Sequence, residues 1–273
     1  MNARPFADRR PPADQAQGLR RLFARPRLRI VPVLANPHML SSGVILERLC
    51  AALEGQGALT LVVDAADSAP AADELATMGL ADCIRPLTPA MSYLPARGLP
   101  LRYVDAQGST ASFLQAVVDA APRAEVVLVH AGASDLARMF ARQALVADVV
   151  PLLLADDRPA SVTHAYAGMK WLALRAQLRV HHLVLEISAG SPRAAHIAAQ
   201  IARCADTFVG ALLRDWSHVD PAGHAQERPP ESLRRLARAL LVGQRPDAAE
   251  PRGDTLPAFA SRPSVASAIQ ALN

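Results

Sequence analysis

Lysine is almost absent from this chain of 273 residues, in which Lys170 is the only one. Aromatic residues are also scarce, at 4% of the total. In one common type of nucleotide-binding loop, a lysine neutralises the charge of the β- and γ-phosphates while glycines let backbone N–H groups surround them. Because Lys170 falls within a predicted helix, no loop of this chain supplies that lysine.

Cysteine is limited to three scattered residues, Cys50, Cys83 and Cys204. They form no C-x-x-C pair and no cluster with histidines at the spacing of a metal site. We therefore expect no metal site. We predict each cysteine to be a small, buried, apolar residue in a reducing compartment.

Long apolar runs are missing as well. The charged start of the chain is followed by no apolar segment typical of a signal peptide, and no run is long enough to cross a bilayer. These absences predict a cytoplasmic protein.

Positive charge is concentrated at the N-terminus. Residues 1–30 carry a net charge of +6 whereas the whole chain carries +4, so the remainder is about −2. This charge suits an acidic protein groove, a membrane surface or a solvated leader. A nucleic-acid surface spread over the fold is not expected.

Histidines are present but dispersed. His181 and His182 are adjacent, so on a strand they point to opposite faces and cannot easily bind one metal. His130 and His164 could approach one another at the carboxyl edge of a sheet. We interpret these residues as core or rim histidines rather than as a site.

Apolar strand patterns alternate with helical patterns through most of the chain, which indicates a parallel sheet covered on both faces. We predict a single three-layer α/β domain over residues 27–273, preceded by a flexible tail over 1–26. The predicted strands are Arg29–Leu34, Leu59–Val63, Val126–Val129, Val149–Leu154 and His182–Ile187. The predicted helices are Val44–Leu53, Asp73–Met78, Phe113–Ala120, Leu136–Ala144, Thr163–Ala176, Ala194–Phe208 and Glu231–Leu241, and Pro86–Pro100 is predicted as a loop.

The last part of the chain, residues 228–273, is predicted to hold one helix and then a loose, proline-rich tail. The helix Glu231–Leu241 places leucines against Arg234, Arg235 and Arg238. Such a basic amphipathic helix either lies on anionic lipid or packs on the sheet with its arginines in solvent. The sequence leaves both interpretations open.

The stretch Asp14–Leu22 reads D-Q-A-Q-G-L-R-R-L. Asp14 can cap a helix, and Ala16, Leu19, Leu22 and Phe23 recur on one helical face. The stretch is too short to be a stable helix alone, so we predict that it forms a helix on a partner.

The wording D-Q-A-x-x-L-R closely resembles the N-terminal activator segment of the FlhG/FleN flagellar-number regulators, in which this segment stimulates FlhF, a GTPase of the signal-recognition type. The resemblance implies partner-binding roles for Asp14, Gln15, Ala16, Leu19 and Arg20. Gln15 would make a polar contact near the nucleotide of that GTPase, and Arg20 would pair with an acidic group or a phosphate. Ala16 and Leu19 would fill an apolar groove.

From about Arg29 to Ala211 the chain is similar to the P-loop proteins of the MinD/ParA class. The phosphate loop of that class reads G-K-G-G-V-G-K-[ST]. Here the loop reads N-P-H-M-L-S-S-G over residues 36–43. Pro37 and Ser42 stand at the two lysine positions, and Gly43 replaces the hydroxyl that binds Mg²⁺. The second-strand carboxylate is kept as Asp64.

Two further stations of the MinD/ParA pattern differ. His130 stands where the family has an Asp for Mg²⁺ or water, and Glu186 stands where it has the Asn that reads adenine. These losses at independent positions predict a pseudo-ATPase with no catalytic residues, no ATP and no bound Mg²⁺.

The segment D-D-R-P-A-S-V-T-H-A-Y-A-G-M-K resembles the family segment P-E-P-T-A-I-T-D-A-Y-A-L-I-K. Thr163 is predicted to cap this helix, and Ala165, Ala167 and Met169 are predicted to pack inward. Tyr166 and Lys170 are interpreted as structural or surface residues.

These resemblances predict a regulator of flagellar number and placement. Its tail would stimulate an FlhF-type GTPase, and its body would be a scaffold that binds a flagellar switch protein or a flagellar transcription regulator. Peripheral contact with the inner membrane or cell pole is a further expectation. The alternatives are an active MinD-like ATPase that cycles on the membrane with a divergent P-loop, and a polar-localisation or partition scaffold unrelated to flagella.

Overall fold

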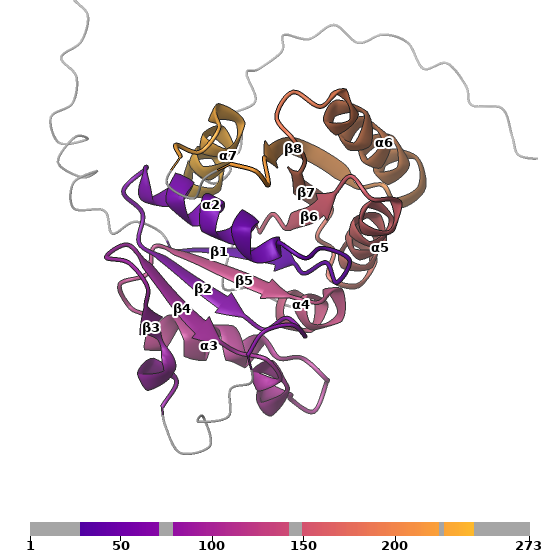
Figure 1. Ribbon diagram of the computed structural model, residues 1–273. Coiled ribbons are helices and arrows are strands. Elements are labelled where there is room, and N and C mark those ends of the chain that lie inside the picture. Colours follow the sequence, from indigo (N-terminus) through magenta and orange to yellow (C-terminus); the bar gives the residue numbers. More distant parts are fainter. Residues whose placement is uncertain (1–27, 71–78, 142–148, 224–226, 243–273) are drawn as a thin grey trace, which may run out of the picture. The chain divides into compact units, whose positions relative to one another are not determined.

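Apolar and amphipathic segments alternate along the chain, and they fold as alternating strands and helices (Figure 1). The computed structural model describes residues 28–70, 79–141, 149–223 and 227–242. The predictions for the tail 1–26, for the helix Asp73–Met78 and for the segment beyond residue 242 lie outside these residues.

The described strands form one sheet in the order β3-β4-β2-β5-β1-β6-β7-β8. Every neighbouring pair is parallel except β3 and β4. Most residues of the central strands are buried, as expected for a parallel sheet covered on both faces. The strands are β1 (Arg29–Leu34), β2 (Thr60–Asp64), β3 (Arg85–Pro86), β4 (Met91–Pro95), β5 (Val126–Ala131), β6 (Leu152–Asp156), β7 (Val180–Glu186) and β8 (Leu212–Val219).

The helices cover the two faces of this sheet and enclose two cores. One face carries α2 (Ser42–Glu54) and α7 (Glu231–Val242), and the other carries the remaining described α-helices (Figure 1). These are α3 (Ala111–Ala120), α4 (Ala133–Phe140), α5 (Pro159–Arg175) and α6 (Pro192–Val209), with short 3-10 turns η2 (Leu80–Cys83) and η3 (Leu99–Tyr103). The prediction of a three-layer α/β domain with a mainly parallel sheet is confirmed.

Helix α5 lies very close to the central strand β1. A Cβ atom added to Gly168 would lie 2.3 Å from Cδ2 of Leu34, the last residue of β1. Only glycine leaves room for this approach, because 2.3 Å is far inside the contact distance of two carbon atoms. The approach brings the start of α5 beside the loop that follows β1.

The structure differs from the prediction where the hydrophobic pattern of the sequence is least regular. The predicted loop Pro86–Pro100 contains strand β4, and strand β8 was not predicted. The prediction of Thr163 as a helix cap is wrong, because α5 already begins at Pro159, a residue whose fixed φ suits a first turn. Ala167 is exposed, whereas Ala165 and Met169 are buried as predicted.

The cysteines are all free, but only one is a core residue. Cys50 is buried on α2, and burial raises the pKa of its thiol to about 12, with the carboxylates of Glu47 and Glu54 adding to the effect. The prediction that all three are buried is wrong for Cys83 and Cys204, which are half-buried.

Helix α7 uses its leucine face to complete the core on the α2 side. Leu233, Leu236 and Leu240 are buried there. The guanidinium of Arg29 donates to the carbonyl oxygens of Leu241 and Val242, at 3.3 and 3.1 Å. The interpretation in which this face lies on lipid is therefore corrected, because the leucines are already covered by protein. No helix in the described ranges is both long and apolar enough to cross a membrane.

Candidate functional site

The loop Ala35–Ser41 joins the central strand β1 to helix α2 and lies at the carboxyl edge of the sheet. Strands β5 and β6 flank β1, so the chain leaves β1 toward one side of the sheet and later returns on the other. In open parallel sheets, ligands bind beside such a reversal of strand order. This loop is therefore the place to look for a site.

Asn36 anchors the loop to β6 and α5. Its side chain is buried, and its Nδ2 lies 2.9 Å from the carbonyl oxygen of Leu154 and 3.0 Å from both the carbonyl oxygen and Oγ of Ser161. Its Oδ1 accepts a hydrogen bond from the N–H of His38 at 3.2 Å. The amide thus uses both of its ends inside the protein.

Two further backbone donors of the loop are also bonded within the protein. The N–H of Ala35 bonds to Ala131 on β5 and the N–H of Met39 bonds to the carbonyl of Asn36, at 2.9 and 3.0 Å. Pro37 has no N–H to offer. The Met39 side chain is buried in the core on the α2 side. A loop that cradles phosphate needs these donors free and pointing at the ligand.

A carboxylate lies beside the residue that precedes α2. Ser41 is the N-cap residue, and its hydroxyl donates to Oε1 of Glu186, which ends β7. Only 9% of Glu186 is exposed. Negative charge near a helix N-terminus complements the helix dipole, and it also repels an incoming phosphate.

Asp156 and Glu186 end neighbouring strands at the same level of the sheet. The guanidinium of Arg158 binds the Asp156 carboxylate and also the backbone carbonyl of His38 in the loop. Burial raises the pKa of Asp156, but the hydrogen bonds and charge of Arg158 outweigh burial and hold this pKa below its ordinary value of 3.8. A cavity of about 330 Å³ opens between these groups and Ser188.

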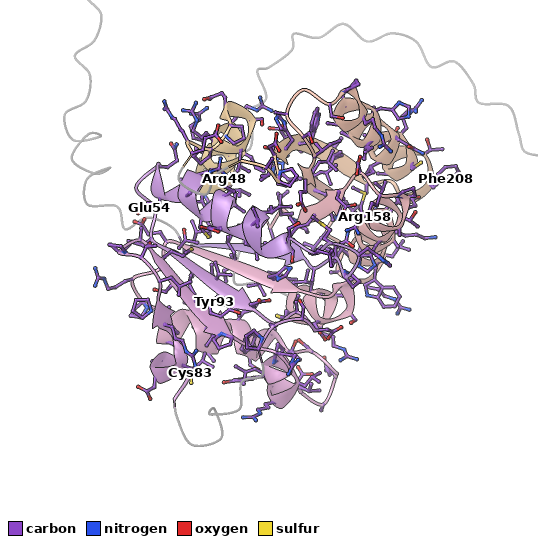
Figure 2. All side chains as sticks on the ribbon, in the orientation of Figure 1. Arg48, Glu54, Cys83, Tyr93, Arg158 and Phe208 are labelled. Carbon is purple, nitrogen blue, oxygen red and sulfur yellow. The ribbon has the colours of Figure 1, made fainter. Side chains whose placement is uncertain are left out.

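On the other side of β1, Asp64 ends β2, and its register partner His130 is the next-to-last residue of β5. His130 Nδ1 lies 2.9 Å from Oδ1 of Asp64, and the hydroxyl of Tyr93 on β4 donates to Oδ2 of Asp64 at 3.1 Å. Tyr93 on β4 and Arg158, just after β6, therefore lie on opposite sides of the central strand β1 (Figure 2). His130 is buried, and its Nε2 has no partner among the described residues.

The electrostatics of this second group follow from its hydrogen bonds. Burial raises the pKa of Asp64, but the hydrogen bond and charge of His130, with donors Ala66 and Tyr93, bring it below its ordinary value of 3.8. Burial and the Asp64 charge raise the pKa of Tyr93 to about 12. The tyrosine therefore stays a neutral donor, and the carboxylate stays an acceptor.

A cavity of about 400 Å³ adjoins this group, and both His130 and His164 line it. Both histidines thus lie at the carboxyl edge, and they share the lining of one cavity. The His38 and His164 rings lie 5.6 Å apart, centroid to centroid, in an edge-to-face arrangement. Burial, together with the nearby His38, lowers the pKa of His164. In the described part of the chain, no three His, Cys, Asp or Glu residues are grouped so as to hold a metal ion.

These residues do not fit ATP with Mg²⁺. Three N–H groups of the loop are bonded inward, a carboxylate adjoins the start of α2, and the guanidinium that contacts the loop is paired with Asp156. Lys170 is exposed on α5, eleven residues after the start of that helix, or about 16 Å along its axis. It is too far from the loop to replace the missing lysine.

The sequence located most of this site but not its contacts. Its body positions all fall at this one edge of the sheet: Pro37, Ser42, Gly43, Asp64, His130 and Glu186. The predicted partner-binding residues Asp14, Gln15, Ala16, Leu19 and Arg20 lie outside the described residues. Sequence reasoning missed Asn36, Tyr93 and Arg158 as contributors. Met91, Tyr93 and Leu94 are only a weak strand signal, which nearby prolines obscure, so the pattern did not indicate a strand carrying Tyr93.

Comparison with known proteins assigns the fold. No family model matches the chain, and no curated protein is similar to it. Among solved structures, the MinD cell division protein of Aquifex aeolicus matches with a TM-score of 0.53 and 10% identity, covering 80% of this chain and 98% of that one. McdA of Cyanothece, solved as an ATP complex, matches with a TM-score of 0.51 and 15% identity, covering 81% and 99%.

Cobyrinic acid a,c-diamide synthase of Mycobacterium smegmatis, solved with ADP and magnesium, gives a TM-score of 0.51 at 16% identity and covers 78% of this chain and 94% of that one. The chain therefore has the fold of MinD/ParA-type P-loop NTPases. At these identities the likeness establishes the fold alone.

Proposed function

We propose that this protein is a regulator of flagellar number and placement whose body does not hydrolyse ATP and whose N-terminal segment stimulates an FlhF-type GTPase. The observation that carries the first part is the loop after β1. The N–H groups of Ala35, His38 and Met39 are bonded within the protein, and Glu186 adjoins the start of α2. A body of this kind serves as a scaffold rather than as a nucleotide switch.

The second part of the proposal rests on the segment D-Q-A-Q-G-L-R, residues 14–20. Its apolar face and Arg20 suit a helix that docks in a groove beside a nucleotide. In this proposal Gln15 contacts the reacting region of the GTPase, and Ala16 and Leu19 fill the groove. The partner performs the hydrolysis, and this chain positions a residue for it.

GTP turnover by an FlhF-type GTPase tests the proposal. A peptide covering residues 11–25 should raise the turnover rate at least about tenfold, which corresponds to about 1.4 kcal/mol of barrier. The matched control is the same peptide with Gln15→Ala, which keeps the helix and the arginines. Equal stimulation by both peptides, or none by either, would refute the assignment.

A second candidate is a MinD-like ATPase with unorthodox nucleotide contacts. It is favoured by Asp64, which keeps the position of the metal-supporting carboxylate, and by the likeness to McdA, which was solved with ATP. Titration calorimetry with ATP and Mg²⁺ separates the two. Micromolar binding that is weakened by Asp64→Asn would favour the ATPase. Absence of binding, combined with GTPase stimulation by the peptide, would favour the scaffold.

A polar-localisation or partition scaffold would also use a silent body. A pull-down with the FlhF-type GTPase distinguishes it, because only a flagellar regulator is expected to bind that partner through residues 14–20.

A further inference from the structure

A second cavity lies at the opposite, amino edge of the sheet. It has a volume of about 410 Å³ and is open to the surface between β2, β4, η2 and the end of α3. Its lining is mainly apolar, and Arg123 is the only charged residue in that lining. The lining includes Leu59, Leu61, Ile84, Pro89, Ala121 and Pro122, and we call this surface the amino-edge groove.

The N-terminal segment joins the body next to this groove. Arg29 begins β1 and is the register partner of Val126 on β5, and Val126 is in turn the register partner of Thr60, which lines the groove. Neighbouring strands lie about 4.8 Å apart, so the start of β1 is about 10 Å from that wall.

The chain also enters on the correct face. Leu28 packs against the core on the α3 side of the sheet, the same core against which Ile84 and Ala121 of the groove pack. The predicted helical face ends at Phe23, five residues before Leu28. An extended chain of that length spans about 17 Å. Phe23 and Leu22 can therefore reach the groove without any rearrangement of the body.

We propose that the amino-edge groove is a docking site for the apolar face of this chain's own N-terminal segment, formed by Ala16, Leu19, Leu22 and Phe23. The groove is mainly apolar, it adjoins the attachment point of the segment, and Leu22 and Phe23 lie within reach of it. Burial of two or three apolar side chains gives a weak, reversible contact once the cost of ordering the segment is subtracted.

This inference rests on the proposed function and adds a form of regulation to it. Leu19 and Ala16 cannot face the groove and the GTPase at once. The body then withholds the activator until the GTPase competes for it, so the full chain stimulates less strongly than the free peptide.

Hydrogen exchange of the full chain tests docking without any GTPase. Ala81→Arg and Pro89→Arg change exposed residues of the groove, so each fills it and repels the basic segment while sparing the core. Exchange of amides 16–23 should become about fivefold faster in both variants, a factor that corresponds to about 1 kcal/mol of docking. The control is Leu212→Arg, which adds the same charge to an exposed residue on β8, at the far end of the sheet.

The segment itself supplies the reciprocal test. Phe23→Ser lies outside the residues assigned to the GTPase, and it should speed the same exchange about fivefold. In the GTPase assay, Ala81→Arg should raise stimulation by the full chain to the level of the free peptide. Exchange that is equally fast in the parent chain, Ala81→Arg and Phe23→Ser would overturn the docking proposal. A peptide that fails to stimulate the GTPase would refute the proposed function and leave the exchange result to decide docking.

Discussion

Two pairs of side chains flank the central strand at the carboxyl edge of the sheet, and their chemistry differs. On one side, Asp64 and His130 are register partners, and Tyr93 completes a chain of hydrogen bonds. On the other side, Asp156 and Glu186 are register partners, and they engage Arg158 and Ser41.

The difference shows two ways of closing the same site from within. The Asp64 carboxylate is bonded to the imidazole of His130 and the neutral phenol of Tyr93. On the other side, Asp156 binds the guanidinium of Arg158, and Glu186 accepts a hydrogen bond from the hydroxyl of Ser41 beside the N-terminus of α2. Asn36 lies between the two pairs and fixes the loop to β6 and α5. Internal contacts hold the side chains on both sides, which predicts stability without nucleotide.

The largest expected effect contrasts these partnered edge groups with the interior of β7. Burial lowers the pKa values of His181 and His182 from 6.5 to about 4. Between these values the unfolded chain binds protons that the folded chain does not, so stability is complete above pH 6.5 and falls as the pH is lowered to 4. Each histidine accounts for about 3 kcal/mol of that loss.

Urea unfolding at pH 7 and pH 4.5 measures this loss. His181→Leu should remove about half of the pH dependence, while His196→Leu, a change at an exposed residue of α6, should leave it intact. A pH dependence that is identical in the His181→Leu variant and the parent chain would contradict the assignment.

The next largest effect comes from releasing the loop from β6 and α5. Asn36→Ala removes the bonds to Leu154 and Ser161 and leaves a small void, so the free energy of unfolding should fall by about 3 kcal/mol. His38→Ala, in the same loop but exposed, should change it by less than about 0.5 kcal/mol. Equal losses in the two variants would show that Asn36 is not the anchor.

Breaking the contacts of Asp64 alone should lower the free energy of unfolding by less. Asp64→Ala leaves His130 without its partner in a buried position, and the expected loss is about 2 kcal/mol. Tyr93→Phe removes only one donor and should cost about 1 kcal/mol. The imidazole ¹⁵N shifts of His130 provide a second measurement, since they should report a changed tautomer in Asp64→Ala and an unchanged one in Tyr93→Phe.

The smallest effect on stability is expected on the Glu186 side of the loop. Glu186→Gln keeps a hydrogen-bonding oxygen for Ser41 and should lower the free energy of unfolding by about 0.5 kcal/mol.

Millimolar ATP with Mg²⁺ should shift the Tm of the parent chain by less than about 1 °C, because a ligand stabilises only in proportion to its binding. A shift above about 3 °C in thermal denaturation would contradict the scaffold interpretation.

Several parts of the fold could be predicted from the sequence because their signals are local. Continuous apolar runs identified β1 and β5 to within two residues, and period-3.6 patterns identified α2 and α6. Strand β4 and strand β8 were missed for the opposite reason. Met91–Pro95 is bounded by prolines, and Leu212–Val219 carries charged residues in its middle, so neither resembles a buried strand.

The sequence by itself determined the fold class, the edge of the sheet where a site belongs and the absence of a lysine to neutralise phosphate there. Each of these follows from residue types and their spacing along the chain. Tertiary structure alone decided that Asp64 meets Tyr93, that Glu186 adjoins Ser41, and that Arg158 contacts the carbonyl of His38. Those pairs join residues from different strands and loops, and strand order, which no local pattern encodes, brings most of them within hydrogen-bonding distance.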